Sequence, residues 1–265
     1  MDGDGYSPCS STSQNQEDEM IRVYNDLEAL SQAAAELFTV ESRQASLICG
    51  RFSVALSGGE TPRRLYEILA APSYRERIHW DEVHIFWSDE RCVPEDDPRN
   101  NARMAHQVLL DRVPIPPDHI HPIRCDQSPQ QAAIQYEKEL KDFFSTQNPN
   151  FHLVLLGLGG NGHIASLFPH TSVLNEQEKW VSDVYVKELG MYRITFTAPF
   201  INQASQVVFL VSGADKAQVL ENVLEGPYQP RELPAQLIRP AGIHPIWLVD
   251  KAASHKLKAQ NEEDI

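Results

Sequence analysis

The sequence has 265 residues, 42% of them hydrophobic and 23% charged, which is typical of a globular protein with a sizeable core. Its formal charge of −14 argues against a nucleic-acid partner, because the phosphates of nucleic acids require a basic face. No apolar stretch reaches the roughly 18 residues of a membrane span, so we expect no membrane partner. The N-terminus is unlike a secretory signal and no cysteines form a C-x-x-C pair, so we expect a reduced, cytoplasmic protein.

The first predicted segment is an N-terminal tail. Residues 1–18 are mostly Ser, Gln, Asp, Glu and Gly, which predicts a disordered acidic and polar segment. Residues 19–265 are predicted to form a single α/β domain. Apolar residues at helical or continuous spacing predict helices over 27–48, 61–71, 102–110, 132–144 and 216–224, and strands over 52–56, 83–87, 151–156, 207–211 and 246–249. We expect a further strand beginning at Arg193 and an irregular surface connection over 227–245.

Continuous apolar strands that alternate with helices predict an α/β fold with a mostly parallel sheet and helices on both faces. This arrangement is the doubly wound, Rossmann-like architecture, in which ligands bind beyond the carboxyl ends of the strands. The residues that follow each predicted strand are therefore the candidates for a binding site.

Glycines and polar residues follow the first two of these strands. After residues 52–56 comes Ser57-Gly58-Gly59-Glu60-Thr61-Pro62, where Thr61 is a candidate N-cap with Pro62 at the first helical position. A glycine turn that feeds a helix N-terminus offers free amides to a phosphate, although a purely structural turn is the alternative. After residues 83–87 come Asp89 and Arg91, which suit sugar hydroxyls or, alternatively, a local ion-pair cluster.

The strand at 151–156 runs into Gly157-Leu-Gly-Gly-Asn-Gly-His163. A histidine at the mouth of a sheet is a candidate proton shuttle, because its ordinary pKa is about 6.5. The same glycines match the dinucleotide fingerprint G-x-G-x-x-G, but Pro169 interrupts the long helix that this fingerprint must open. A tight turn with an exposed histidine is the third alternative.

Two cations stand near the ends of later strands. Lys216 falls in the first turn of a predicted helix, where a positive charge opposes the helix dipole unless an anion lies beside it. Arg193 offers a bidentate fork to a phosphate, or is simply a solvated charge. His119 and His121 lack the carboxylates or cysteines that would complete a metal site, so we expect no metal.

Taken in order, these motifs resemble the glucosamine-6-phosphate isomerase/6-phosphogluconolactonase family. Within this family they resemble the 6-phosphogluconolactonases. The resemblance covers roughly residues 50–250 and rests on the following segments: Ser57–Pro62, Ser88–Pro94 with Asn101, Gly157–Pro169, Arg193–Thr195 and Ser212–Lys216. It implies a fold similar to glucosamine-6-phosphate deaminase. It also implies cofactor-free hydrolysis of 6-phosphogluconolactone to 6-phosphogluconate in the oxidative pentose phosphate pathway.

On this interpretation His163 is the general base that activates water, and Asn161 orients it. Asn161 departs from the family pattern, which has an aspartate before the Gly-His pair, so the imidazole is oriented without added charge. The expected substrate-binding residues are Ser57, Gly58, Gly59, Thr61, Asp89, Arg91, Gly160, Arg193 and Lys216. The expected partner is a small sugar-phosphate lactone, and the expected state is a monomer or weak dimer.

Three questions stay open at this point. A deaminase on the same scaffold needs an acid–base residue after the histidine, and the run Ile164–Pro169 contains no acid. Alternatively, the protein is a non-catalytic sugar-phosphate sensor that keeps the pocket. The observation that favours this alternative is Asn161 in place of the family aspartate. Arg91 is the first candidate to face the lactone, with Arg75 and Arg77 as alternatives if their loop folds over the site.

Overall fold

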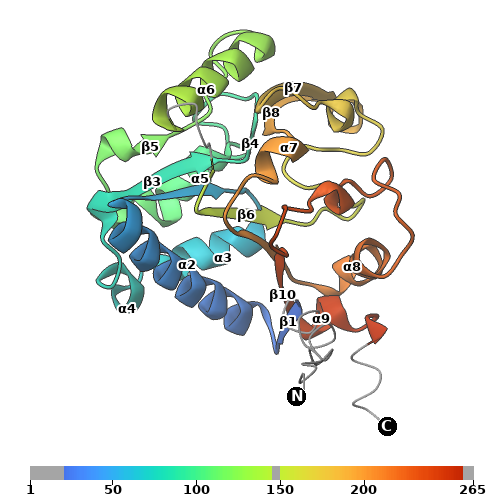
Figure 1. Ribbon diagram of the computed structural model, residues 1–265, viewed down its shortest axis with the longest axis horizontal. Helices are drawn as coiled ribbons and strands as arrows, with labels where there is room; N and C mark the ends of the chain where they lie inside the picture. The colour runs from blue at the N-terminus through green and yellow to red at the C-terminus, as the bar shows by residue number, and fades with distance from the viewer. Residues whose placement is uncertain (1–20, 145–149, 259–265) are drawn as a thin grey trace, which may run out of the picture.

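The computed structural model describes residues 21–144 and 150–258. Within these residues, seven parallel strands form the central sheet in the order β1-β10-β9-β6-β2-β3-β5 (Figure 1). Their bounds are β1 Ile21–Tyr24, β2 Phe52–Leu56, β3 Val83–Trp87, β5 Ile120–His121, β6 Leu153–Gly157, β9 Val207–Val211 and β10 Ile246–Asp250. Every residue of β2 and β9 is buried, as expected of strands covered on both faces.

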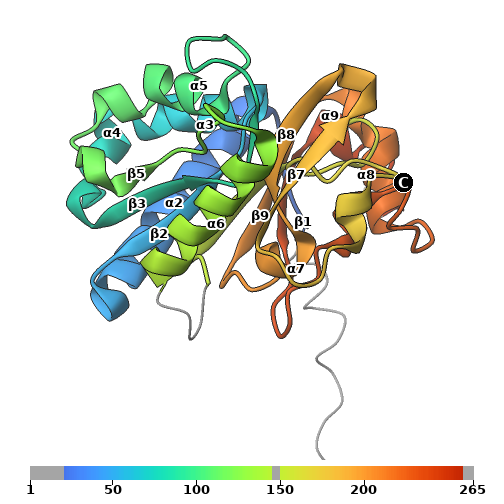
Figure 2. The same cartoon turned by 90° about the horizontal axis from the view of Figure 1, so that it is seen from above.

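Helices cover both faces of this sheet, as the sequence predicts. Figure 1 places α2 and α3 below the sheet and α6 above it, and Figure 2 shows α6 in front of β2 and β3 with α2 behind. The α-helices are α2 Leu27–Cys49, α3 Glu60–Leu69, α4 Pro72–Arg75, α5 Asn101–Val108, α6 Pro129–Phe144, α7 Ala198–Ile201, α8 Ala217–Leu224 and α9 Lys251–Ser254. The 3₁₀ turns are η1 Trp80–Glu82, η2 Leu110–Arg112, η3 Pro117–His119, η4 Ser172–Asn175, η5 Lys187–Leu189, η6 Ala214–Lys216 and η7 Pro234–Leu237.

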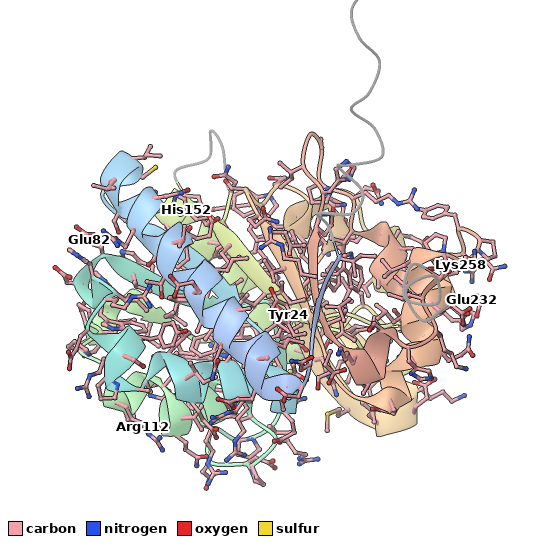
Figure 3. All side chains as sticks on the ribbon, turned by 90° about the horizontal axis from the view of Figure 1, so that it is seen from below. Tyr24, Glu82, Arg112, His152, Glu232 and Lys258 are labelled. Carbon is pink, nitrogen blue, oxygen red and sulfur yellow. The ribbon has the colours of Figure 1, made fainter. Side chains whose placement is uncertain are left out.

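The long helix α2 shows how local sequence and packing agree. Its N-cap Asp26 accepts a hydrogen bond from the Ala29 N–H at 2.8 Å, which satisfies one of the free amides of the first turn. Leu30, Ala34 and Phe38 recur at helical spacing and are almost completely buried. Figure 3 shows α2 crossing this face of the molecule from the neighbourhood of Tyr24 toward His152.

A second, smaller sheet was not predicted as a unit. It is antiparallel, in the order β4-β8-β7, with bounds β4 Asp89–Arg91, β7 Val181–Val186 and β8 Met191–Phe196. Strand β4 consists only of charged residues, so hydrophobic periodicity could not reveal it. Arg193 lies inside β8 and not at its beginning, so that part of the prediction is wrong.

Two further sequence predictions are corrected by the structure. Helix α3 begins at Glu60 with Gly59 as its N-cap, so Thr61 lies in the first turn and caps nothing. The segment 227–245 is not simply a surface connection, because η7 is largely buried and the Ala235 N–H donates to the Gly162 carbonyl at 2.9 Å. The segment therefore supports the glycine turn that precedes His163.

The predicted tail over residues 1–18 lies outside the described residues, and the single domain over 19–265 stays a prediction. The buried side chains of the described residues form one continuous hydrophobic cluster that reaches from α2 to α9. None of the described helices is long and apolar enough to cross a bilayer.

Candidate active site

A pocket opens where the carboxyl ends of the central strands meet. The chain crosses from β2 to β3 on one side and later places β6 on the other side of β2, so the strand order reverses between β2 and β6. Such a reversal leaves a crevice outside the sheet edge. The cavity there measures about 520 Å³ and is lined by Ser57, Gly58, Gly59, Glu60, Thr61, Pro62, Asp89, Arg91, Gly157, Leu158, Gly159, Gly160, His163, Ile164, Ala165, Arg193, Leu210, Val211, Ser212, Asp215 and Lys216.

Nearly all of the site residues predicted from the sequence line this cavity, and Asn161 is the exception. Asn161 belongs to the glycine turn and does not line the cavity, but its Oδ1 atom contacts His163, which does. Arg75 and Arg77 do not line the cavity. Arg77 instead pairs with Glu36 on α2, with 2.9 Å between Nη1 and Oε2. Arg91 is therefore the arginine of these three that faces the pocket.

The β2 end of the pocket is built by strand register. Leu56 pairs with Trp87, so the residues that follow them, Ser57 and Ser88, lie side by side with 2.9 Å between their Oγ atoms. The Ser57 hydroxyl donates to the Leu155 carbonyl at 2.7 Å. Its side chain therefore ties β2 to β6 and contributes to the pocket wall, which leaves the following glycine amides as the more available donors.

Asn101 supports the site from outside the cavity lining, and the analysis of strand ends passed over it. A Cβ on Gly58 would lie 1.8 Å from its Oδ1 atom, so Gly58 must be glycine for the Asn101 side chain to pack there. Asn101 Nδ2 also donates to the Asp89 carbonyl at 3.0 Å. The Asn101 side chain thus bridges the loop after β2 and strand β4, and its only signal in the sequence was membership of the family motif.

Glu90 fixes the start of α5 behind the pocket. Its carboxylate accepts hydrogen bonds from the backbone N–H groups of Asn101 at 2.8 Å and Ala102 at 2.9 Å, which would otherwise be free at the helix N-terminus. Burial raises the pKa of Glu90 to about 7, against the lowering effect of these donors. Glu90 therefore fixes the backbone position of Asn101.

Asp89, Ser166 and Arg193 form a buried polar network at the floor of the site. Ser166 Oγ donates to Asp89 Oδ2 at 2.6 Å, and Arg193 Nη1 lies 3.7 Å from the same oxygen. Ser166 was not singled out from the sequence, although it belongs to the glycine–histidine motif. The preceding residue, Ala165, has a φ of 44°, a left-handed conformation that is uncommon outside glycine and is found at functional sites.

His163 is held on two sides. Its ring stacks on Phe168 with 4.0 Å between centroids, and its Nδ1 lies 2.6 Å from Asn161 Oδ1. Because an amide oxygen can only accept, Nδ1 carries the ring proton and Nε2 keeps a lone pair. A Cβ on Gly159 would lie 2.0 Å from His163 Nδ1, so glycine is required where the backbone passes the imidazole.

The electrostatics of the site keep this imidazole neutral. The pKa of His163 is lowered to about 4, chiefly by burial; Asp89 opposes this effect, and the positive charges of Arg193, Lys216 and Arg91 add to it. At neutral pH the ring is therefore uncharged, with Nε2 able to accept a proton. An anionic ligand would offset the three cations and raise the basicity of His163.

Each of these three cations has at least one partner in the protein, but the two arginines keep a donor without one in the described residues. The Nε atoms of Arg91 and Arg193 are buried and have no hydrogen-bond partner in the described part of the chain. Lys216 stands at the N-cap of α8, with its Nζ 3.2 Å from Asp215 Oδ2. Buried donors without partners suit a ligand that brings several acceptor oxygens, such as a phosphate. Among residues 21–144 and 150–258, no cluster of His, Cys, Asp and Glu is suited to a metal ion.

The Rossmann-like sheet has at its switch point a cationic pocket with a neutral histidine, which is the kind of site that suits a small anionic ligand beside a candidate proton acceptor. Residues 25–247 match the family described as glucosamine-6-phosphate isomerases/6-phosphogluconolactonase. The chain therefore belongs to this family, and the resemblance inferred from the motifs is confirmed.

Individual relatives agree with this assignment. A 6-phosphogluconolactonase from Synechocystis sp. is 45% identical over 213 residues, which cover 79% of this chain and 86% of that protein. The structure of 6-phosphogluconolactonase from Trypanosoma cruzi has a TM-score of 0.79 at 27% identity, covering 90% of this chain and 96% of its own. A monomeric glucosamine-6-phosphate deaminase has a TM-score of 0.76 at 20% identity over 89% of this chain and 99% of its own, so the predicted likeness in fold is confirmed.

Proposed function

We propose that this chain hydrolyses 6-phosphogluconolactone to 6-phosphogluconate, the reaction of the oxidative pentose phosphate pathway that the names of its relatives describe. The observation that carries the proposal is a neutral His163 in the same cavity as three cations. A cationic pocket alone would serve a binding protein, but a histidine with a free Nε2 adds a proton acceptor. The expected cytoplasmic location and monomeric or weakly dimeric state are part of the same proposal.

The reaction needs a base, a place for an oxyanion and a proton for the leaving group. His163 Nε2 takes a proton from water while the water oxygen attacks the lactone carbonyl. The tetrahedral intermediate then expels the ring oxygen, which receives that proton from His163, so the base is regenerated. General acid–base catalysis of this kind contributes about 10²–10⁴-fold.

Other groups support the charges that develop. Asp89 raises the pKa of His163, so its carboxylate favours the imidazolium that forms during attack. The backbone N–H of Gly160, a residue that lines the cavity, is assigned to the oxyanion, because the N–H groups of Gly159 and Gly162 already donate to the carbonyls of His163 and Gly159. Asn161 holds the Nδ1 proton and thereby keeps Nε2 as the accepting atom.

The phosphate is assigned to the cationic side of the cavity. Gly58 and Gly59 lie at the N-terminus of α3, where backbone amides and the helix dipole favour an anion. Arg193 and Lys216 supply charge-assisted donors, while Asp89 and Arg91 are assigned to the sugar hydroxyls. Binding the remote phosphate fixes the position of the carbonyl relative to His163, which lowers the entropic cost of the reaction.

The test is a coupled assay in which freshly prepared 6-phosphogluconolactone is converted to 6-phosphogluconate and the product is oxidised by a dehydrogenase. The spontaneous hydrolysis rate is subtracted from each trace. The proposal expects enzyme-dependent product formation that saturates with lactone. Turnover no faster than the spontaneous rate, together with tight binding of 6-phosphogluconate, would instead support the sensor alternative.

The same preparation separates the lactonase from the deaminase alternative. A deaminase would release ammonia from glucosamine 6-phosphate, which needs an additional acid–base group near the histidine. The run Ile164–Pro169 supplies Ser166 instead, and its hydroxyl is already bonded to Asp89. We therefore expect no ammonia release under conditions in which the lactone is hydrolysed.

A further inference from the structure

Two cysteines lie together beside the strand that carries Arg91. Cys92 directly follows β4, and Cys125 lies in the connection between β5 and α6, 33 residues along the chain. Their sulfur atoms are 2.7 Å apart, and both cysteines are free. We propose that Cys92 and Cys125 form a reversible intramolecular disulfide, which makes this pair a site of redox modification.

The geometry requires little movement. An S–S bond is about 2.05 Å long, so the two sulfur atoms need to approach by only about 0.65 Å. The backbone of Cys92 is held in place, because its N–H donates to the Tyr192 carbonyl at 3.0 Å. The pair therefore forms a crosslink between the end of β4 and a separate loop without rearrangement of the small sheet.

The pair can also be reached from outside. Both side chains are half-buried, and both line a surface hollow of about 540 Å³ whose other walls include Arg99, Gln127, Tyr185 and Tyr192. This hollow is separate from the candidate active site, since the two share no lining residue. A small disulfide such as oxidised glutathione, or the disulfide of a dithiol protein, has access to the sulfur atoms there.

The chemistry assigns different roles to the two thiols. Cys125 donates a hydrogen bond to the Cys92 sulfur, which lowers the pKa of Cys92, although burial and the charges of Glu90 and Asp183 oppose this effect. The Cys92 thiolate attacks one sulfur of oxidised glutathione and releases one glutathione thiolate. Cys125 then loses its proton and attacks Cys92 in the mixed disulfide, which releases the second glutathione thiol. Two protein thiols are oxidised and one glutathione disulfide is reduced, so the electrons balance.

The experiment uses the full chain with Cys9→Ser and Cys49→Ser, because Cys49 is an exposed free cysteine and Cys9 lies outside the described residues. This background protein, and the same protein with Cys92→Ser or Cys125→Ser added, is equilibrated in glutathione buffers from fully reduced to fully oxidised. Free thiols, intact mass and melting temperature are measured before and after treatment with dithiothreitol.

The proposal expects the background protein to lose both thiols with no added glutathione mass and no covalent dimer. Closing a loop of this length should raise its melting temperature by roughly 4–16 °C, and dithiothreitol should reverse the change. Each single-cysteine variant should accumulate only a glutathione adduct and show no such rise. A background protein that keeps both thiols in fully oxidised buffer, retains glutathione or dimerises would overturn the proposal. None of these measurements depends on the proposed reaction.

Discussion

Arg91 and Arg193 face each other directly across the antiparallel pair of strands β4 and β8, and both guanidinium groups line the same cavity. Like charges that are opposite one another in a sheet are destabilising. The ion pair between Arg193 and Asp89 relieves only part of this repulsion, because the Nε atoms of both arginines stay without a partner in the described residues. A substrate that brings its phosphate to Arg193 and its sugar hydroxyls to Arg91 would supply these missing acceptors.

Replacing Arg193 with alanine should therefore weaken use of the phosphorylated lactone. We expect kcat/KM to fall roughly 10- to 150-fold, which corresponds to one lost hydrogen bond to a charged group. The loss should appear mainly in KM and should shrink for the corresponding lactone without a phosphate. Arg77→Ala is the matched control, since Arg77 pairs with Glu36 away from the pocket and its loss should leave KM unchanged. Equal losses on both lactones would remove Arg193 from the phosphate site.

Lys216→Ala should behave in the same direction as the Arg193 variant. Its Nζ contacts the exposed carboxylate of Asp215, so the protein itself should tolerate the change with little loss of stability. We expect KM for the phosphorylated lactone to rise by a similar factor, with kcat less affected. An unchanged KM, measured by the same coupled assay, would show that Lys216 does not contact the substrate.

Gly159 and Gly160, which are adjacent in the turn, provide a matched pair of alanine variants. A Cβ at position 159 would overlap the imidazole of His163, whereas a Cβ at position 160 would meet no atom within 4 Å. Gly159→Ala should therefore displace His163 and reduce kcat by about 10²-fold or more, within the range for loss of a general base. Because alanine keeps the backbone N–H that is assigned to the oxyanion, Gly160→Ala should stay within about threefold of the unmodified protein. Equal kcat values for the two variants would show that the position of His163 is not critical.

Asn161→Asp tests how the histidine is oriented. Burial lowers the pKa of His163 to about 4, so the account expects kcat/KM to fall only as the pH drops through about 4. A carboxylate in contact with Nδ1 favours the imidazolium, so the pKa should rise by about 1–3 units. The acidic limb should then move to higher pH by the same amount, and the plateau should hold or rise.

Asn161→Ala is the control for this shift. Alanine removes the hydrogen bond to Nδ1 but adds no charge, so the plateau should fall while the acidic limb does not move upward. If the limb of the Asn161→Asp variant also stays in place, then Asn161 does not lie next to the ionising group.

The parts of the fold and site that could be predicted are those that depend on residues close together in the sequence. Buried strands read as continuous apolar runs, and Gly58, Gly159 and His163 stand directly after them, so the parallel sheet and the loops at its edge followed from the sequence. The capping role assigned to Thr61 was wrong because the helix begins at Glu60, two residues earlier than the motif suggests, with Gly59 as its N-cap.

The remaining parts depend on contacts between distant segments. Strand β4 has no apolar residue; the Ser166 hydroxyl donates to Asp89, and backbone N–H groups at the start of α5 donate to Glu90. Asn101 acquires its position by filling the space over Gly58, 43 residues earlier in the chain. Neither relationship leaves a periodic pattern in the sequence, so the family motif pointed to Asp89, Arg91 and Asn101, and only the folded chain shows the contacts that hold them in place.

The central claim is that His163 accepts the proton from water, and the most direct test is kcat for His163→Asn on freshly prepared 6-phosphogluconolactone. Asparagine retains a polar side chain but cannot act as a base at neutral pH. We predict that kcat falls by about 10²–10⁴-fold while binding of 6-phosphogluconate and the melting temperature change little. The control His255→Asn, at the end of α9, should keep full activity. A His163→Asn variant that retains a third or more of the original kcat would contradict the account.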